Sequence, residues 1–235
     1  MQGIVKYFFI VVCLVLFSFT HAYGDSVDFK DQTVISVDEI VQRALTSYRN
    51  LSSFYSKGRV IQNMDMGGQA TSITREFEIR LAKPSKYFIS WDMNASPVGL
   101  QQYVIWNEGN GPRGYPHQLD VMFKNFEGNN LVFSAGLGIS GGASFSVPML
   151  FFDFEGNILK LIKNLRIIGE ESVQGDDCYI LSGDSNVSLD HRVWISKESF
   201  FIRKIAYTSA MNLLQEELYE IVQPNKAFLN KDFKY

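Results

Sequence analysis

The sequence has few of the residues that build disulfides and metal sites. It contains two cysteines and three histidines in 235 residues. Cys178 lies in an alternating stretch with no base nearby, so we predict a buried and unreactive thiol. His117 and His191 have neither a histidine four residues away nor the cysteine spacing of a zinc site. The sequence therefore predicts no metal site, and it predicts that both histidines lie at the surface or at a sheet edge.

Charge of either sign is also scarce. Lysine and arginine number 22 against 25 acidic residues, a net charge of −3, so the basic excess of a nucleic-acid-binding protein is absent. No G-x-S-x-G motif and no nucleophile–base signature occurs. We therefore predict a protein that is not an enzyme and needs no cofactor. A hydrolase with dispersed residues is the alternative, and it requires a pocket that joins His117 or His191 to a carboxylate.

The first 22 residues have the pattern of a secretory signal peptide. Lys6 supplies the positive start, an apolar run extends from Tyr7 to Phe19, and small residues precede Ala22 at the cleavage positions. The apolar run is short for a membrane span. We predict cleavage near Ala22, a periplasmic or otherwise exported protein, and one domain over residues 23–235 with a single cysteine and no intramolecular disulfide. An uncleaved anchor is the alternative.

One helix and then a series of strands are predicted after the signal peptide. Apolar residues recur at helical spacing in "VDEIVQRALTSYRNL", and Ser36 with Glu39 fits a capping box at its start. The period then changes to two, as in "TSITREFEIRLAKP", and Gly67-Gly68 marks the turn of a long hairpin. In that segment Ile73, Phe77 and Ile79 share one face of the strand. The opposite face is polar and faces solvent.

Seven further segments have the pattern of strands separated by turn residues. They make an α+β protein with about nine antiparallel strands and no βαβ alternation. The last of them also fits a helical period and is left open between strand and helix. The segments are "KYFISWDM", "QQYVIWNEG", "NLRIIGEESV", "DCYILSGD", "DHRVWISKES", "FFIRKIAYTS" and "LLQEELYEIV".

An uncharged segment separates the two groups of strands. From Gly128 to Phe152 no residue is charged, and apolar residues occur throughout Leu131 to Phe152. The length of the segment would suffice for a membrane span, but its glycines, serines and Pro148 argue against one. We expect an insert at about 128–152 that forms short helices or a mobile flap on the apolar face of the sheet.

The same insert contains a G-x-G-x-x-G pattern at residues 136–141. A dinucleotide site needs this pattern between a strand and a helix in a parallel βαβ unit. Here Pro148 interrupts the following helix and the surrounding strands are antiparallel, so we do not predict nucleotide binding. We expect the glycines to act as the hinge of a lid, namely Gly136, Gly138, Gly141 and Gly142.

Aromatic and aliphatic residues are abundant, with 19 phenylalanines in the chain. An ordinary core explains them, but a curved sheet under a glycine-containing apolar insert also makes a cavity for an acyl chain. The strand parity and the insert together give these predicted cavity residues: Phe77, Ile79, Trp91, Ile105, Phe133, Leu137, Phe145, Met149, Phe151, Ile180, Trp194 and Ile205.

The order of these elements resembles the periplasmic lipoprotein-carrier superfamily, the LolA/LolB-like proteins and their uncharacterised branch. The resemblance covers most of residues 23–235. It rests on "ALTSYRNLSSFYSKGRV", on "RLAKPSKYFISW" with Lys83-Pro84 before Phe88, and on "DDCYILSG" followed by "HRVWISKESFFIRKIAYT". The resemblance implies a strongly curved, incomplete antiparallel β-barrel with helices over its concave apolar face.

The resemblance also implies a function. It indicates an exported protein that holds a lipid or acylated ligand in an apolar cavity and works with inner- or outer-membrane trafficking components. The segment "WNEGNGPRGYPHQLD" departs from the carrier pattern, and no position matches the functional arginine of the carriers. The alternative is an interaction module that docks a membrane-protein partner through residues 131–152.

Overall fold

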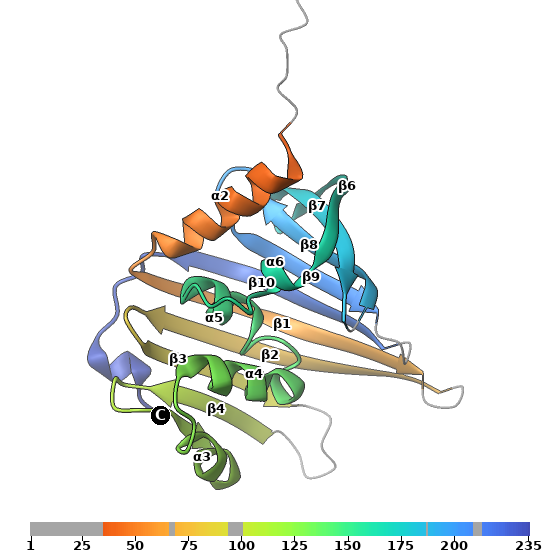
Figure 1. Ribbon diagram of the computed structural model, residues 1–235. Helices are drawn as coiled ribbons and strands as arrows, with labels where there is room; N and C mark the ends of the chain where they lie inside the picture. The colour runs from red at the N-terminus through yellow and green to blue at the C-terminus, as the bar shows by residue number, and fades with distance from the viewer. Residues whose placement is uncertain (1–34, 66–68, 94–100, 187, 209–212) are drawn as a thin grey trace, which may run out of the picture. The chain divides into compact units, whose positions relative to one another are not determined.

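Ten antiparallel strands form one sheet in the order β5-β4-β3-β2-β1-β10-β9-β8-β7-β6 (Figure 1). Within the described residues the end strands β5 and β6 do not pair, so the sheet stays open. The strands are β1 (Ser53–Asp65), β2 (Ala70–Ala82), β3 (Lys86–Met93), β4 (Gln101–Asn107), β5 (Arg113–Tyr115), β6 (Lys163–Val173), β7 (Asp176–Ser185), β8 (Ser188–Ser196), β9 (Ile202–Thr208) and β10 (Leu214–Pro224).

This computed structural model describes residues 35–65, 69–93, 101–186, 188–208 and 213–235. The predicted signal peptide and the Gly67-Gly68 turn lie outside these ranges. Ser36–Tyr235 is a compact unit by itself, and it contains every element named here.

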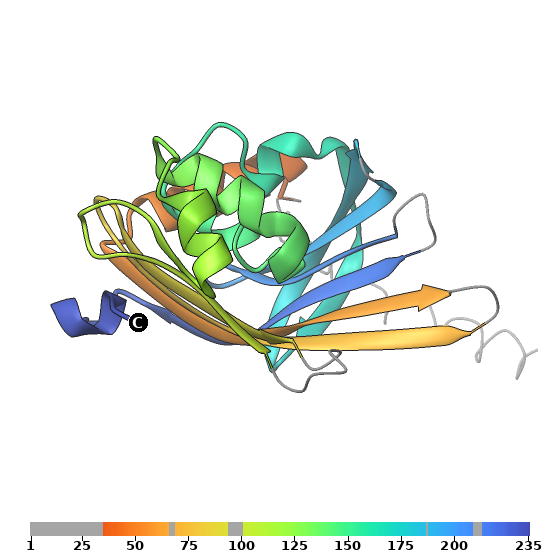
Figure 2. The same ribbon diagram turned by 90° about the horizontal axis from the view of Figure 1, so that it is seen from below.

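The sheet curves, and short helices occupy its concave side (Figure 2). They are α3 (His117–Phe123), α4 (Asn129–Ser140), α5 (Ser146–Phe151) and α6 (Ile158–Leu161). The predicted α+β fold with a curved, incomplete barrel is therefore confirmed. Helices α4 and α5 lie within the segment at about 128–152. Among the described residues, no helix is both long and apolar enough to cross a membrane.

Helix α2 (Val37–Arg49) closes one end of the concave side. Ser36 Oγ accepts a hydrogen bond from the Glu39 amide at 3.1 Å, which starts the helix as the sequence predicts. The buried stripe of α2 includes Tyr48, whose hydroxyl accepts a hydrogen bond from the Ile202 amide at 3.1 Å. The Tyr48 ring also packs against Phe201, with 5.2 Å between ring centroids. The helix is thereby fixed to the start of β9.

Two hydrophobic clusters lie on the opposite, convex face. Phe88, Val104 and Trp106 pack with Phe233 of the 3-10 helix η1 (Asn230–Phe233). The second cluster contains Val173, Cys178, Trp194 and Ala206. Cys178 is buried, and burial raises the pKa of its thiol to about 11, as expected for an unreactive thiol.

Two details of the strand prediction change. The sheet has ten strands because Arg113–Tyr115, inside "WNEGNGPRGYPHQLD", pairs with β4 as β5. The segment "LLQEELYEIV", left open between helix and strand, is the strand β10, and it joins the two halves of the sheet by pairing with both β1 and β9.

Candidate functional site

The turn between α4 and α5 rests directly on β10. Gly141 has φ +64° and Gly142 has φ +106°, conformations that L side chains rarely adopt. A Cβ atom on Gly142 would lie 1.8 Å from Oε1 of Glu217. The Gln215 amide nitrogen donates a hydrogen bond to the Gly141 carbonyl at 2.8 Å. The two glycines therefore let the main chain approach two polar side chains that point inward from β10.

Glu217 is a carboxylic residue in the interior, with 2% of its surface exposed. The Tyr219 hydroxyl donates a hydrogen bond to its Oε2 at 3.0 Å, and Ser146 and Gln215 also hydrogen-bond the carboxyl group. Burial outweighs these hydrogen bonds and raises the pKa of Glu217 to about 7. Near neutral pH the group therefore exists in both protonation states.

A row of polar side chains extends from Gln215 across the concave face. Gln62 Nε2 donates to Gln215 Oε1 at 2.5 Å, and Arg75 Nη1 donates to Gln62 Oε1. Arg75 is 6% exposed, its Nε has no hydrogen-bond partner among the described residues, and burial lowers its pKa. The sheet therefore buries one cation and one acid on the same face and connects them through two glutamines.

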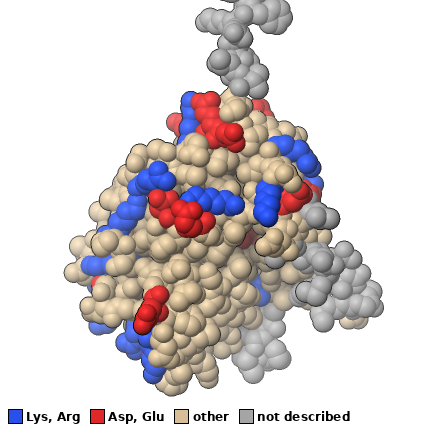
Figure 3. Space-filling model, viewed as in Figure 1, with Lys and Arg blue, Asp and Glu red and all other residues tan. Residues whose placement is uncertain are grey.

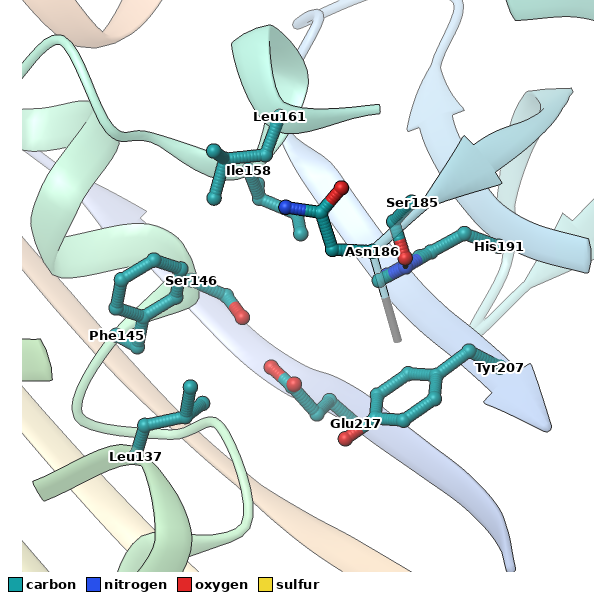
Figure 4. A pocket seen from close by; sticks show the side chains of 10 residues that line it. All are labelled: Leu137, Phe145, Ser146, Ile158, Leu161, Ser185, Asn186, His191, Tyr207 and Glu217. Atoms are coloured by element: carbon teal, nitrogen blue, oxygen red, sulfur yellow. Dashed lines mark hydrogen bonds between the residues drawn. The ribbon is translucent and has the colours of Figure 1, made fainter. Parts of the chain in front are cut away.

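A pocket opens beside Glu217, between the helices and strands β7–β10. Its cavity volume is about 140 Å³, and it is partly open to solvent. Leu137 and Phe145 lie on one side of it, and His191 and Tyr207 lie on the other (Figure 4). The lining residues are Leu137, Phe145, Ser146, Ile158, Leu161, Ser185, Asn186, His191, Tyr207 and Glu217.

His191 is buried, with 3% of its surface exposed, and this corrects the prediction of a surface or edge histidine. Its Nδ1 lies 3.2 Å from Ser185 Oγ, and its ring packs against Tyr207 with 4.9 Å between centroids. Burial lowers the pKa of His191 to about 4, so the imidazole is neutral at pH 7. Its Nε2 has no hydrogen-bond partner among the described residues. His117 is exposed at the start of α3, as predicted.

This arrangement suits binding better than catalysis. The pocket does join His191 to a carboxyl group, which is the requirement set above for a hydrolase. However, Ser185 Oγ, which contacts the imidazole, also donates to the Ser188 carbonyl at 3.4 Å. A histidine with a pKa of about 4 is a weak base at neutral pH. Among the described residues, His191 and Ser185 therefore do not form an activated nucleophile.

The structure brings together only part of the predicted cavity residues. Leu137 and Phe145 line the pocket. Eight others are buried in the core of the concave side, where neighbouring side chains surround them, so ligand contact by these eight stays a prediction. They are Phe77, Ile79, Trp91, Ile105, Phe133, Met149, Phe151 and Ile205.

Ile180 and Trp194 lie elsewhere. Trp194 belongs to the convex cluster with Cys178, and half-buried Ile180 packs against that cluster. These two residues pair with each other across β7 and β8, so they share a face. The strand parity assumed for them in the sequence is inverted, and their side chains point away from the pocket.

The glycine pattern does not have the geometry of a nucleotide site. Gly136 and Gly138 lie inside α4, and Gly141 ends that helix. A pyrophosphate site requires the glycines before a helix N-terminus, so here the pattern stands at the wrong end of the helix. A Cβ on Gly136 would lie 2.6 Å from Ser144 Oγ, whereas a Cβ on Gly138 would meet no atom within 4 Å. The hinge role of the four glycines stays a prediction.

Sequence reasoning missed the polar residues of the site. A signal was present, because Gln215, Glu217 and Tyr219 alternate along β10, and Arg75 lies between Ile73 and Phe77 on the predicted apolar face. A polar residue on the buried face of a strand must find partners. The identity of those partners was not readable, since Gln62 and Gln215 are 153 residues apart.

No protein-family model and no curated protein matches this chain. Solved structures do match it. MucB in complex with MucA(peri) is 12% identical with a TM-score of 0.45, and the match covers 85% of this chain but only 60% of the MucB chain. LprF from Mycobacterium bovis is 8% identical with a TM-score of 0.47, over 81% of this chain and 93% of LprF. A LolA superfamily protein from Nitrosomonas europaea is 9% identical with a TM-score of 0.35, over 86% of this chain and 98% of that protein.

Proposed function

We propose that this chain binds an acyl chain or a similar apolar ligand in the pocket between α4, α5, α6 and strands β7–β10. One observation carries the proposal. Four apolar side chains from α4, α6 and the residue before α5 line an opening that the core leaves unfilled, namely Leu137, Phe145, Ile158 and Leu161. Leu137 and Leu161 are also partly exposed, so they connect the interior of the pocket to the surface.

The energetics favour a chain-like ligand. Each methylene transferred from water to an apolar site contributes about 0.8 kcal/mol. A twelve-carbon chain enclosed along its whole length would gain roughly 10 kcal/mol before the cost of ordering the ligand and the side chains is subtracted. The cavity of about 140 Å³ encloses part of such a chain, and the rest extends through the side that is open to solvent.

In this proposal the protein acts after export. Residues 1–22 direct secretion and are removed, and the single domain over 23–235 carries its ligand in the periplasm between membrane trafficking components. The insert at about 128–152 serves as the cover of the pocket. Its Gly141-Gly142 turn is the point where the cover meets β10, and thus the place where opening starts.

The structure favours this proposal over docking through residues 131–152. Most of this segment is buried against the sheet, including Phe133, Phe145 and Phe151. The outer surface of α4 carries no charged residue, and few charges surround it (Figure 3). The large apolar side chains exposed on α4 are Leu131 and Leu137, and single exposed residues are common on any surface.

Binding is tested with 1-monododecanoylglycerol and isothermal titration calorimetry. Leu137 and Leu131 are leucines of the same helix, with 38% and 47% of their surfaces exposed. Of the two, only Leu137 lines the pocket. We expect L137D to weaken binding at least tenfold, because it places a charge at the apolar opening. The matched control L131D should bind as the native protein does. Absence of binding to the native protein, or equal loss in both variants, contradicts the proposal.

A further inference from the structure

The two sides of the pocket differ in chemistry. Phe145 and the lining residues of α4 and α6 are apolar, whereas β7–β10 and the turn after β7 contribute hydroxyl, amide, imidazole and carboxyl groups, and Ser146 of α5 adds a hydroxyl group. In Figure 4 the carboxyl group of Glu217 points toward Ser146, and His191 and Tyr207 lie on the same side as the strands. A bound acyl compound therefore meets polar groups along one side, and these groups select its polar end.

The charge of the polar side is unusual for a lipid site. Among its described lining residues there is one acid, Glu217, and no lysine or arginine. The buried cation Arg75 lies behind Gln62, with which it is already hydrogen-bonded, and it does not line the pocket. An anionic end group beside Glu217 would therefore have no positive partner among the described lining residues and would lie next to an acid, which is costly.

Hydrogen-bond capacity points in the same direction. We assign the Ser185 hydroxyl hydrogen to the Ser188 carbonyl, 3.4 Å away, and in this assignment the Ser185 oxygen accepts from the Nδ1–H of neutral His191. This tautomer leaves Nε2 of His191 as an acceptor, and that atom has no partner among the described residues. Glu217 adds carboxyl oxygens nearby. Both groups are satisfied by a ligand that brings O–H hydrogens.

We propose that the pocket selects acyl compounds whose polar end is uncharged and donates hydrogen bonds, such as the hydroxyl groups of a monoacylglycerol, and rejects carboxylate and phosphate ends. This inference rests on the proposed function and adds the class of the ligand. His191 and Glu217 are the residues that read the end group, while the helices hold the chain.

Four probes with the same twelve-carbon chain test the selection at pH 8, below their aggregation concentrations, by calorimetry on the full chain. They are 1-monododecanoylglycerol, methyl dodecanoate, dodecanoate and dodecyl phosphate. We expect the two anions to bind at least tenfold more weakly than the monoacylglycerol, and methyl dodecanoate to lie between them. Equal or tighter binding of the anions overturns the inference. If no probe binds, the proposed function fails and the inference fails with it.

Two pairs of variants assign the selection to residues. Glu217→Gln removes the acid and should raise the affinity for dodecanoate about tenfold, with less than a threefold change for the monoacylglycerol. Glu216→Gln is the matched control, since Glu216 neighbours it in β10 but pairs with Lys204 on the convex face. Glu216→Gln should leave the ratio of the affinities for dodecanoate and for the monoacylglycerol unchanged. An unchanged ratio in Glu217→Gln contradicts the assignment.

The second pair of variants concerns Nε2 of His191, the proposed hydrogen-bond acceptor. His191→Phe keeps an aromatic ring against Tyr207 but removes Nε2, so the monoacylglycerol should lose its advantage over methyl dodecanoate. His191→Gln retains a carbonyl acceptor, so it should restore part of the affinity advantage of the monoacylglycerol over methyl dodecanoate. The melting temperature of each variant is measured alongside, and affinity for methyl dodecanoate reports that the pocket is intact. A full advantage in folded His191→Phe contradicts the role of Nε2.

Discussion

The two halves of the concave face differ in how completely side chains fill them. Over β2–β4 the face is filled, because the Phe133 ring of α4 packs against Tyr87 at 5.0 Å between centroids and against Phe152 and Phe154. Over β8–β10 the face carries His191, Tyr207 and Glu217, and the pocket lies there. The same curved sheet thus has a packed core at one end and a pocket at the other.

The difference follows from the size and polarity of the side chains. Tyr87, Ile89 and Trp91 alternate along β3 and supply bulky groups to the filled half. The corresponding inward positions of β10 are Gln215, Glu217 and Tyr219, whose polar atoms need hydrogen-bond partners and cannot simply be covered. Stability and binding therefore depend on different halves, and substitutions in each half should separate them.

The largest expected effect is the loss of an aromatic ring from the filled half. Phe133→Ala should lower the free energy of unfolding by about 4 kcal/mol, because a fully enclosed ring leaves a cavity. Phe145→Ala in the open half should cost about half as much and should weaken acyl binding, since one side of that ring faces the pocket. Urea denaturation and calorimetry measure the two effects. Equal destabilisation by both would remove the distinction between the halves.

The next largest effect concerns the Gly141-Gly142 turn of the insert, which rests on β10. Gly142→Ala should lower the free energy of unfolding by about 3 kcal/mol, because the backbone there has φ +106° and the new Cβ would clash with Glu217. Gly138→Ala is the control in the same insert. A Cβ there meets open space inside α4, so it should raise stability by about 0.5 to 1 kcal/mol. Denaturation curves that show the same sign for both would contradict this account.

The pH dependence of stability should divide between the acid and the histidine of the pocket. The folded pKa of Glu217, about 7, exceeds its ordinary 4.5, so its contribution is present below pH 4.5 and is lost as pH rises through 7. The folded pKa of His191, about 4, is below its ordinary 6.5, so its contribution is present above pH 6.5 and is lost as pH falls through 4. The two slopes oppose each other.

Substituting each group alone separates the two contributions to the pH dependence of stability. Glu217→Gln should make stability rise between pH 4 and 7, with a gain relative to the native protein of about 2 to 3 kcal/mol at pH 8. His191→Gln should instead leave a stability that falls over the same interval. Thermal unfolding in a pH series measures both. Profiles of the two variants that run parallel to the native profile would show that neither group titrates in this interval.

The sequence predicted local structure better than it predicted the site. Alternation, capping and turn residues are local, so helix α2, the long hairpin and the antiparallel sheet were readable. Alternation shows which residues share a face, but not which face becomes concave, and this inverted the placement of Trp194 and Ile180. The contacts of Gln215 join β10 to β1 and to the insert, and no local pattern encodes them.

Methyl NMR tests most directly whether the ligand occupies the open half. In a titration with 1-monododecanoylglycerol, the methyl signals of Leu137, Ile158 and Leu161 should shift and show contacts with the chain protons of the ligand, since these residues line the pocket. The methyl signals of Leu81 and Ile89, buried in the filled half, should remain where they are. Ligand contacts to the second group, with none to the first, would contradict the central claim.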